Sequence, residues 1–427
     1  MIRFTQSIKD SFSIDDLSVA LLSHIVSKQQ NKELLLRIED RKEQKSKDCF
    51  DKETIELLNL FNIEYSRIVD QNDNIKYHTQ MAMRLLLDKK AFNCFCTDEA
   101  LQKDKEEAKK NGKRYEYSGF CQNISDETKF HCNAPFVVRL NKPKNDIKFS
   151  DKIKGDLSFK PYEVDSVVIL DHEKKPTNIF SSAVDDMLYD ISTIIQSQNN
   201  LSNIPKQINI MSYLGYEKEI NYIHTPNIIN IDTEDRLPNI KSLIDQGYLP
   251  AAIANYLVLL ITNRSEDIFT IEEAIGWFDI ADISKEQLKF DIKELNKINK
   301  KYLNMIDELR LSKILGYADE DIGKLAKLYI QECDTISQIK ENIQAIFSSK
   351  GSLEGFEKQF ELIKSTLQTA PFIKDYEELL EFISKQTDLK DEDIMIPLYY
   401  IITGQKNGPK LDSIYPYIRN YLGEIIK

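Results

Sequence analysis

Six cysteines are the side chains in this sequence with the widest chemical repertoire, and four of them lie between residues 94 and 132. Six cysteines in 427 residues are too few for the disulfide framework of a secreted protein, and their placement is local. Reduced thiols grouped in this way can bind a metal ion as thiolates, or they can pack as small, half-buried hydrophobic side chains. Either arrangement predicts a reducing, cytoplasmic location.

A second group of reactive side chains lies near the N-terminus, where Ser13 precedes Asp15 and Asp16. Serine followed three residues later by aspartate is a helix-capping pattern, in which the helix satisfies its own free amides and its own dipole. Two carboxylates roughly 5 Å from a phosphate would each cost about 3 kcal/mol at an effective dielectric of about 20. The alternative is that the adjacent aspartates hold Mg²⁺, which could bridge to phosphates.

These residues belong to a chain with 41% hydrophobic and 30% charged residues, which can bury several cores and excludes disorder. The net charge of −12 repels polyanions, so contact with nucleic acid needs a local patch, and we expect no DNA binding. The N-terminal MIRFTQSIKD lacks the apolar core of a secretory signal. The longest apolar stretch, from Leu249 to Ile261, contains Asn255 and is too short to cross a membrane, which predicts a buried helix.

The spacing of apolar residues predicts five segments that position these groups. Residues 1–90 alternate a strand, a long helix and a second strand that contains LLLRIED. Residues 91–163 break into Cys, Gly, Tyr and turn residues with short strands such as PFVVRL, which is typical of an inserted subdomain. In 164–220, DSVVIL and STIIQ predict further strands of the first, parallel sheet. Residues 221–300 lead from a loop-rich segment into the buried helix, and 301–427 have helical spacing with charged outer faces.

Short strings along nearly the whole chain carry a resemblance to a known family. They are RF with Ser7, LLLRIED, AFNCFCT, YSGFC, PFVVRL, KPT, VDD, LSNIPKQI, GYLPAAIANYL and ITGQKNGP. In this order they resemble the glutamyl-tRNA synthetases, class I ligases of the bacterial type.

The resemblance implies an α/β Rossmann-like catalytic domain, whose two halves are 1–90 and 164–220. Between them, 91–163 would be an inserted α+β subdomain of the acceptor-stem and zinc type. A stem-contact-like region over 221–300 and an all-α, anticodon-binding-like C-terminal domain over 301–427 would follow.

The resemblance also implies a HIGH tetrapeptide, which class I synthetases place at a helix N-terminus that can receive phosphate. In this chain the HIGH position is filled by Ser13, Ile14, Asp15 and Asp16. Aspartates at the positions where the family needs small residues prevent the backbone from approaching a nucleotide. This site is expected to exclude phosphate.

The second ATP signature of the family is a KMSKS-type loop, whose lysines hold the charge that develops on the triphosphate. The corresponding stretch here reads HTPNIINIDTEDRLPN, and no lysine occurs between Lys218 and Lys241. Its charged side chains are Asp232, Glu234, Asp235 and Arg236. Two independent losses, both replaced by acids, argue against adenylate formation.

The family's amino-acid pocket is only partly retained. Residue types that hold the glutamate carboxylate and the α-amino group are present at Arg3, Ser7 and Glu39. Three other pocket positions differ from the family, namely Asn178, Ser182 and Gln196. Because Gln196 replaces an arginine that pairs with the substrate carboxylate, glutamate binding should weaken by about 1.5 to 3 kcal/mol. The alternative for Arg3 and Glu39 is a structural ion pair at adjacent strand ends.

The resemblance implies a structural zinc site in the inserted subdomain. Its ligands would be Cys94, Cys96, Cys121 and, as in related truncated enzymes, Tyr117. A histidine that some members carry is Asn123 here, and His131 or Cys132 could also supply the fourth ligand. Three reduced, half-buried thiols are the alternative, while Cys49 and Cys333 are expected to be packing residues.

The helical C-terminal third corresponds to the part of the family that holds the anticodon stem and loop. Basic residues that could contact phosphates are Lys293, Lys297, Lys300, Lys301, Lys406, Lys410 and Arg419. Tyrosines that could stack on unpaired bases are Tyr399, Tyr400, Tyr415 and Tyr417. The alternatives are a solvated helix face for the lysines and core packing for the tyrosines.

Two functions follow from these patterns. The chain could be a divergent ligase that uses ATP and Mg²⁺ to attach glutamate to tRNA. It could instead be a paralogue that has lost adenylation and binds tRNA or a protein partner, such as an active synthetase. The acidic Ser13–Asp16 turn and the lysine-free loop favour the second hypothesis.

Overall fold

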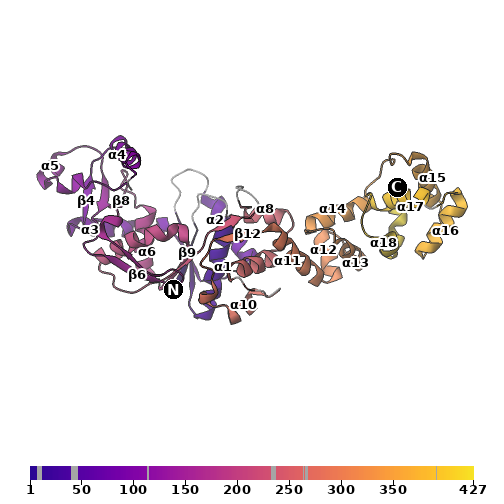
Figure 1. Cartoon of the computed structure of the whole chain (residues 1–427), viewed down its shortest axis with the longest axis horizontal. Coiled ribbons are helices and arrows are strands. Elements are labelled where there is room, and N and C mark those ends of the chain that lie inside the picture. The colour runs from indigo at the N-terminus through magenta and orange to yellow at the C-terminus, as the bar shows by residue number, and fades with distance from the viewer. Residues whose placement is uncertain are drawn as a thin grey trace. The chain divides into compact units, whose positions relative to one another are not determined.

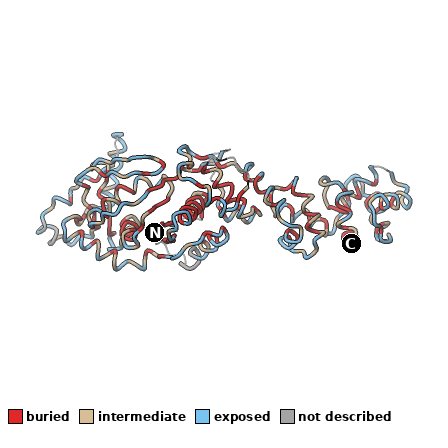
Figure 2. The backbone as a smooth tube through the Cα atoms, turned by 90° about the horizontal axis from the view of Figure 1, so that it is seen from below, coloured by how far each residue is buried: buried red, intermediate tan, exposed pale blue. Residues whose placement is uncertain are grey.

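The structure is a computed structural model that describes residues 1–6, 12–39, 47–112, 115–231, 237–262, 264, 268–390 and 392–427. The chain forms two compact units, one of Met1–Ile240 with Leu257–Phe290 and the other of Lys241–Tyr256 with Asp291–Lys427. Figure 1 labels their helices and strands. Each unit has its own buried interior, which is red in Figure 2. The five segment boundaries expected from the sequence stay predictions.

A seven-stranded sheet with the order β3-β2-β1-β9-β10-β6-β7 forms the base of the first unit. Neighbouring strands run parallel from β3 to β6, and β7 is antiparallel to β6. A parallel sheet is covered on both faces, which explains why every residue of LLLRI is buried. The strands are β1 (Ile2–Gln6), β2 (Leu34–Ile38), β3 (Arg67–Asp70), β6 (Ile147–Asp151), β7 (Gly155–Phe159), β9 (Thr193–Ser197) and β10 (Asn221–Thr225).

Helices of the first unit connect and cover these strands. The α-helices are α1 (Ile14–Gln29), α2 (Lys47–Leu60), α3 (Ile75–Leu87), α4 (Asp98–Lys110), α5 (Asp126–His131), α6 (Asn178–Leu188), α7 (Ile204–Tyr213) and α10 (Ile271–Trp277). The 3-10 turns are η1 (Gln71–Asn74), η2 (Phe120–Asn123), η3 (Pro161–Glu163), η4 (Gln198–Asn203) and η5 (Ile280–Asp282). Helix α1 packs against β1 and β9 and buries Leu17, Leu21 and Leu22 completely, so its first turn is held at the edge of the sheet.

A small antiparallel sheet stands apart from the main one, with the order β4 (Ala91–Cys94), β5 (Val137–Leu140) and β8 (Val168–Leu170). The expectation that DSVVIL joins the parallel sheet is therefore wrong, because β8 pairs with β5. Conversely, the β6–β7 hairpin comes from the predicted insertion and extends the main sheet. Short apolar runs have the same pattern in both sheets, so only strand pairing separates them. A third sheet pairs β11 (Ile228–Asn230) with β12 (Leu288–Phe290).

The second unit is helical, as the sequence predicts. Its helices from residue 291 onward are α11 (Ile292–Met305), α12 (Glu308–Leu315), α13 (Glu320–Tyr329), α14 (Ile336–Phe347), α15 (Glu357–Gln368), α16 (Tyr376–Thr387), α17 (Glu392–Thr403), α18 (Leu411–Ile418), η6 (Arg419–Tyr421) and α19 (Leu422–Ile425). The predicted buried helix is α9 (Pro250–Thr262), and α8 (Ile240–Asp245) precedes it. Among the described helices, none has both the length and the apolar character that a membrane span requires.

Candidate functional site

The first turn of α1 closes on itself through the predicted capping box. The Asp16 amide donates to Ser13 Oγ at 3.1 Å, and the Ser13 amide donates to Asp16 Oδ2 at 3.0 Å. Ser13 Oγ also donates to Asp16 Oδ2 at 2.7 Å. A helix N-terminus attracts anions through its free amides and its dipole, and here the helix supplies its own carboxylate. The capping prediction is confirmed.

Asp15 lies beside this box and is largely removed from water. Burial raises the pKa of Asp15 to about 6, and the neighbouring Asp16 carboxylate adds to this rise. The backbone amide of Ile228 opposes the rise by donating to Asp15 Oδ1 at 3.4 Å. Near neutral pH the first turn of α1 therefore presents two carboxylates, and one of them accepts a proton in mild acid.

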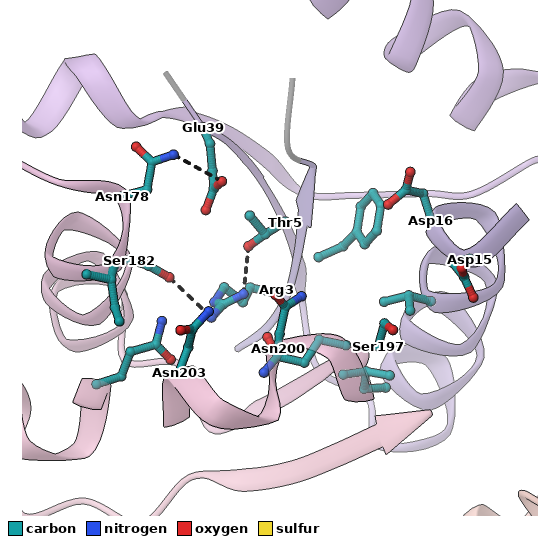
Figure 3. A pocket seen from close by; sticks show the side chains of 16 residues that line it. Arg3, Thr5, Asp15, Asp16, Glu39, Asn178, Ser182, Ser197, Asn200 and Asn203 are labelled. Carbon is teal, nitrogen blue, oxygen red and sulfur yellow. Dashed lines mark hydrogen bonds between the residues drawn. The ribbon is translucent and has the colours of Figure 1, made fainter. Parts of the chain in front are cut away.

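A cavity of about 250 Å³ opens between this helix and the carboxyl ends of β1 and β9. In doubly wound sheets ligands bind at this position, where connections leave neighbouring strands in opposite directions. Figure 3 shows Asp15 and Asp16 on one side of the cavity and Glu39, Asn178 and Ser182 on the other. Its lining residues are Arg3, Phe4, Thr5, Asp15, Asp16, Val19, Glu39, Asn178, Ile179, Ser182, Ile195, Gln196, Ser197, Asn200, Asn203 and Gln207.

The Arg3 guanidinium lies in the floor of this cavity and is occupied by protein groups. Its Nε contacts Asp186 Oδ1 at 2.5 Å, and one terminal nitrogen contacts Asp186 Oδ2 at 3.1 Å. The remaining contacts are with Thr5 Oγ1 at 2.6 Å and Ser182 Oγ at 3.3 Å. Arg3 therefore pairs with Asp186, and not with Glu39 as in the alternative considered from the sequence. Four of the five donors of an arginine are used within the protein.

Glu39 follows β2 and is held at the cavity wall by two side chains. Its Oε1 accepts from Arg37 at 3.1 Å, and its Oε2 accepts from Asn178 at 3.4 Å. Arg37 is shared, because its Nε also donates to Asp185 at 2.9 Å. Burial opposes ionisation of Asp185, but its hydrogen bond with His78 and the Arg37 guanidinium lower the pKa of this carboxyl. Asp185 thus balances much of the positive charge of the Arg37 guanidinium.

Gln196 occupies the position where the resemblance implies an arginine, and a buried relay orients its amide. The Asp151 carboxylate accepts from His224 Nδ1 at 2.6 Å, and also from the amides of Ile153 and Lys154. In the tautomer that carries its proton on Nδ1, facing Asp151, the imidazole accepts at Nε2, so Gln196 Nε2 is the donor across 2.9 Å. Burial alone would raise the pKa of Asp151, but the His224 bond and these amides lower it. The Oε1 atom of Gln196 is left as an acceptor.

The expected pocket residues come together in part. Arg3, Glu39, Asn178, Ser182 and Gln196 all line the same cavity as Asp15 and Asp16. Ser7 lies outside the described residues, as do Asp232, Glu234, Asp235 and Arg236 of the second ATP signature. The side chain of Cys49 is also not described.

Sequence reasoning did not single out three residues that shape this site. Asp186 had a local signal, because VDD places two carboxylates in an otherwise apolar helical stretch. His224 and Asp151 are 73 residues apart and had no local signal, since only the pairing of β10 with β6 brings them together.

The expected metal ligands form a compact group in the first unit. Ligand atoms of Cys94, Cys96 and Cys121 lie within 4.8 Å of one another, and they are the group of potential metal ligands found among the described residues. Cys96 Sγ lies 3.6 Å from Cys121 Sγ, while the Tyr117 hydroxyl lies 3.3 Å from Cys94 Sγ and 3.6 Å from Cys96 Sγ. Zinc–sulfur bonds of about 2.3 Å give tetrahedral edges of about 3.8 Å, so these residues fit zinc.

Burial controls the protonation of this group when no cation is bound. Burial raises the pKa of the Cys96 thiol to about 11 and raises the pKa of Tyr117 well above its usual value. Cys94 differs, because the Tyr117 hydroxyl, the Cys96 amide and Arg139 outweigh burial and lower its pKa. Neither His131 nor Cys132 belongs to the group. Cys333 is buried in the helical core, as expected of a packing residue.

Some of the candidate RNA-contacting residues of the second unit are paired with other protein groups, and others are exposed. Lys297 contacts Glu294 at 2.6 Å and Lys300 contacts Asp334 at 3.0 Å, whereas Lys293, Lys406 and Lys410 are exposed. Arg419 donates to the Lys374 carbonyl at 3.1 Å, and Lys301 is exposed on α11. Tyr415 is buried and donates to the Ile373 carbonyl at 2.8 Å, and Tyr399, Tyr400 and Tyr417 pack on the same core. Core packing accounts for these tyrosines.

Comparison with known proteins defines the class. Residues 3–297 match the family model described as tRNA synthetases class I (E and Q), catalytic domain. The chain is 40% identical to Glutamate–tRNA ligase 2 of Sulfurimonas denitrificans and 41% identical to Glutamate–tRNA ligase 1 of Campylobacter jejuni, with all of each chain covered. A solved glutamate tRNA ligase from Elizabethkingia meningosepticum shares the fold, with a TM-score of 0.78 at 17% identity, covering 100% of this chain and 98% of that one.

These findings define a class I aminoacyl-tRNA synthetase fold with a helical C-terminal region, as the resemblance implied. Within that class, the full-length identity of about 40% to two glutamate–tRNA ligases identifies the family. The chain belongs to the glutamyl-tRNA synthetase family.

Proposed function

We propose that this family member does not form glutamyl adenylate and acts as a tRNA-binding protein. The observation that carries the proposal is the capping box at the start of α1. Asp16 satisfies the helix end that phosphate would need, and Asp15 lines the same cavity with a second carboxylate. Both repel a triphosphate, and Arg3, the cation among the described lining residues, is already paired with Asp186.

The amino-acid side of the cavity supports the same conclusion. Arg3 is paired with Asp186 in a fully buried, bidentate contact. Gln196 contributes an uncharged amide where a second cation would be needed for a dicarboxylic amino acid. A lost charge-assisted bond costs about 1.5 to 3 kcal/mol, which weakens glutamate binding roughly tenfold or more.

Membership of this family supports tRNA as the binding partner. The exposed Lys293, Lys406 and Lys410 of the second unit can neutralise phosphates, and each such contact would add to the salt dependence of affinity. The expected protein partner, an active synthetase, is the alternative if tRNA is not bound.

We also propose that Cys94, Cys96, Tyr117 and Cys121 hold a structural zinc ion. Their geometry supports this assignment, and zinc bound there would clip β4 to the η2 turn. Thiolate ligands persist in a reducing compartment, which supports a cytosolic location.

Single-turnover aminoacylation with purified protein, ATP, Mg²⁺, labelled glutamate and total tRNA tests the proposal. We expect no charging above the control without protein, together with retention of tRNA in a filter-binding assay. Charging would contradict the proposal and favour the active ligase, the alternative that 40% identity to named ligases supports. Absence of both charging and tRNA retention would contradict tRNA binding and favour a protein partner.

A further inference from the structure

Two side chains of the small antiparallel sheet contact the ring of Tyr117, which lies beside the cysteine group. Phe92 of β4 stacks on it, with ring centroids 6.1 Å apart and ring planes inclined by 24°. The Arg139 guanidinium of β5 lies over the same ring, 4.5 Å from its centroid. Because Phe92 and Arg139 are directly opposite each other in the β4–β5 pairing, the register of this sheet places both against Tyr117.

Arg139 is buried, although its guanidinium is always charged. It is 8% exposed, and one terminal nitrogen donates to the Ser166 carbonyl at 2.9 Å. Its Nε atom is buried and has no hydrogen-bond partner among the described residues. A charge removed from water is costly unless opposite charge lies close to it. The position of Arg139 therefore calls for negative charge on the neighbouring groups.

The cysteine group can supply that negative charge. Arg139 attracts the Cys94 thiolate, and the hydroxyl of the ring that it covers lies 3.3 Å from Cys94 Sγ and 3.6 Å from Cys96 Sγ. Three thiolates around a divalent ion leave one net negative charge, and a phenolate ligand leaves two. A guanidinium over the ring offsets this charge and is itself attracted by the ring face.

The segment that anchors Arg139 also fixes the backbone of Tyr117. Asp165 Oδ1 accepts from the Tyr117 amide at 3.3 Å and from the Ser166 amide at 2.8 Å. The Ser166 carbonyl in turn accepts from Arg139. Groups of this kind, which contact the ligands and not the metal, change metal affinity by about 10- to 100-fold when they are replaced.

We infer that Arg139 is a positioning residue of the zinc site, which holds the Tyr117 ring toward the cysteines and offsets the negative charge of the ligand set. This inference rests on the proposed zinc site. It deepens that proposal, because it assigns zinc affinity in part to a residue that is not a ligand.

Zinc titration against a chromophoric chelator, on the native chain and its variants, tests this inference. We expect Arg139→Gln to weaken zinc binding at least about tenfold, with the affinity of Arg139→Lys between those of this variant and the native chain. Lysine keeps the charge but lacks the planar group that both stacks and forks. The absorption spectrum of bound Co²⁺ should change in Arg139→Gln, because Tyr117 is no longer held at the fourth position.

Arg67→Gln is the matched control. It makes the same replacement at an arginine of the same unit, which lies 5.9 Å from the centroid of the Tyr189 ring and outside the cysteine group. It should leave zinc affinity within about twofold of the native value and the Co²⁺ spectrum unchanged.

Equal zinc affinities for the two glutamine variants, or native affinity in Arg139→Lys, would each overturn the inference. Urea unfolding adds a separate check, because an arginine that only supports the fold would stabilise the zinc-free and zinc-loaded protein equally. If Arg139→Gln does not fold, the affinity and Co²⁺ spectrum of Arg139→Lys decide the question. Absence of zinc from the native chain would overturn the proposed zinc site, whereas bound zinc that is insensitive to the Arg139 variants would overturn this inference alone.

Discussion

Gln196 donates from Nε2 to Nε2 of His224 across 2.9 Å, and Asp151 on the other side of the imidazole determines that direction. A neutral imidazole has one donor and one acceptor nitrogen, so a carboxylate on Nδ1 makes Nε2 the acceptor. One buried aspartate therefore controls which atom of Gln196 is available in the cavity.

Replacing Asp151 with asparagine should lower the free energy of unfolding by about 1.5 to 3 kcal/mol at neutral pH, because a charged acceptor is lost. The pKa of Asp151 is lowered in the folded state, so its stabilisation is present above the ordinary value of 3.8 and declines as pH falls through the lower folded pKa. Urea unfolding of both proteins at several pH values measures this. Equal stability at pH 7 would contradict it.

Replacing Asp15 with asparagine should raise the free energy of unfolding, which is the opposite of the effect expected for Asp151→Asn. The folded pKa of Asp15 is raised from 3.8 to about 6, so the folded state binds more protons between these values, and stability falls as pH rises through this window. The variant removes the charge and keeps an acceptor for the Ile228 amide. We expect it to exceed the native chain by about 2 to 3 kcal/mol at pH 8 and to match it near pH 4. A variant less stable at pH 8 would disprove the account.

Reopening the first turn of α1 should restore nucleotide binding. The triple variant Ser13→His, Asp15→Gly and Asp16→Gly removes both carboxylates and the capping side chain, so backbone amides become available to phosphate. ATP at 100 times its dissociation constant would add about 2.7 kcal/mol of stability, which thermal unfolding detects. The native chain should show no such shift. If ATP leaves the triple variant unchanged, the capping box is not what excludes the nucleotide.

Purified protein should contain about one zinc per chain by mass spectrometry of metals. Cys96→Ser should lose the metal, and a chelator should lower the Tm of the native chain by at least about 5 °C. The control is Cys333→Ser, which changes a buried cysteine outside the ligand group and should keep the metal. Equal zinc content in the two variants would rule out the assignment.

Asp186→Asn should destabilise the chain strongly, because it leaves the Arg3 guanidinium buried without its counter-charge. Breaking one partner of a buried ion pair costs about 3 to 5 kcal/mol. The comparison variant Glu64→Gln breaks an exposed pair with Lys28 and should leave the unfolding midpoint unchanged. Similar midpoints for both variants in denaturant would show that Arg3 does not depend on Asp186.

Local features of the candidate site were predictable from sequence. The capping box needs only Ser13 and Asp16, three residues apart on one chain segment, and the structure contains it. Tyr117 and Cys121 are joined within a single turn of backbone, where the Cys121 amide donates to the Tyr117 hydroxyl at 3.2 Å. Such contacts depend on spacing, which can be read directly.

The pairing of strands could not be predicted from the sequence. The run DSVVIL was correctly predicted as a strand, yet β8 pairs with β5 and not with the parallel sheet. A short apolar run shows that it is buried, without showing which neighbour covers it.

The sequence by itself determined the family, the class of fold and the acidic first turn of α1, because each depends on residue types at short, ordered spacings. Only the tertiary structure decided that Arg3 faces Asp186, that Asp15 meets the Ile228 amide, and that Asp151 orients Gln196 through His224. The bonded partners in these contacts are separated by 28 to 213 residues, and strand register and helix packing bring their atoms within bonding distance. Charge balance in the cavity depends on those long-range pairs, so the chemistry of its ligand does as well.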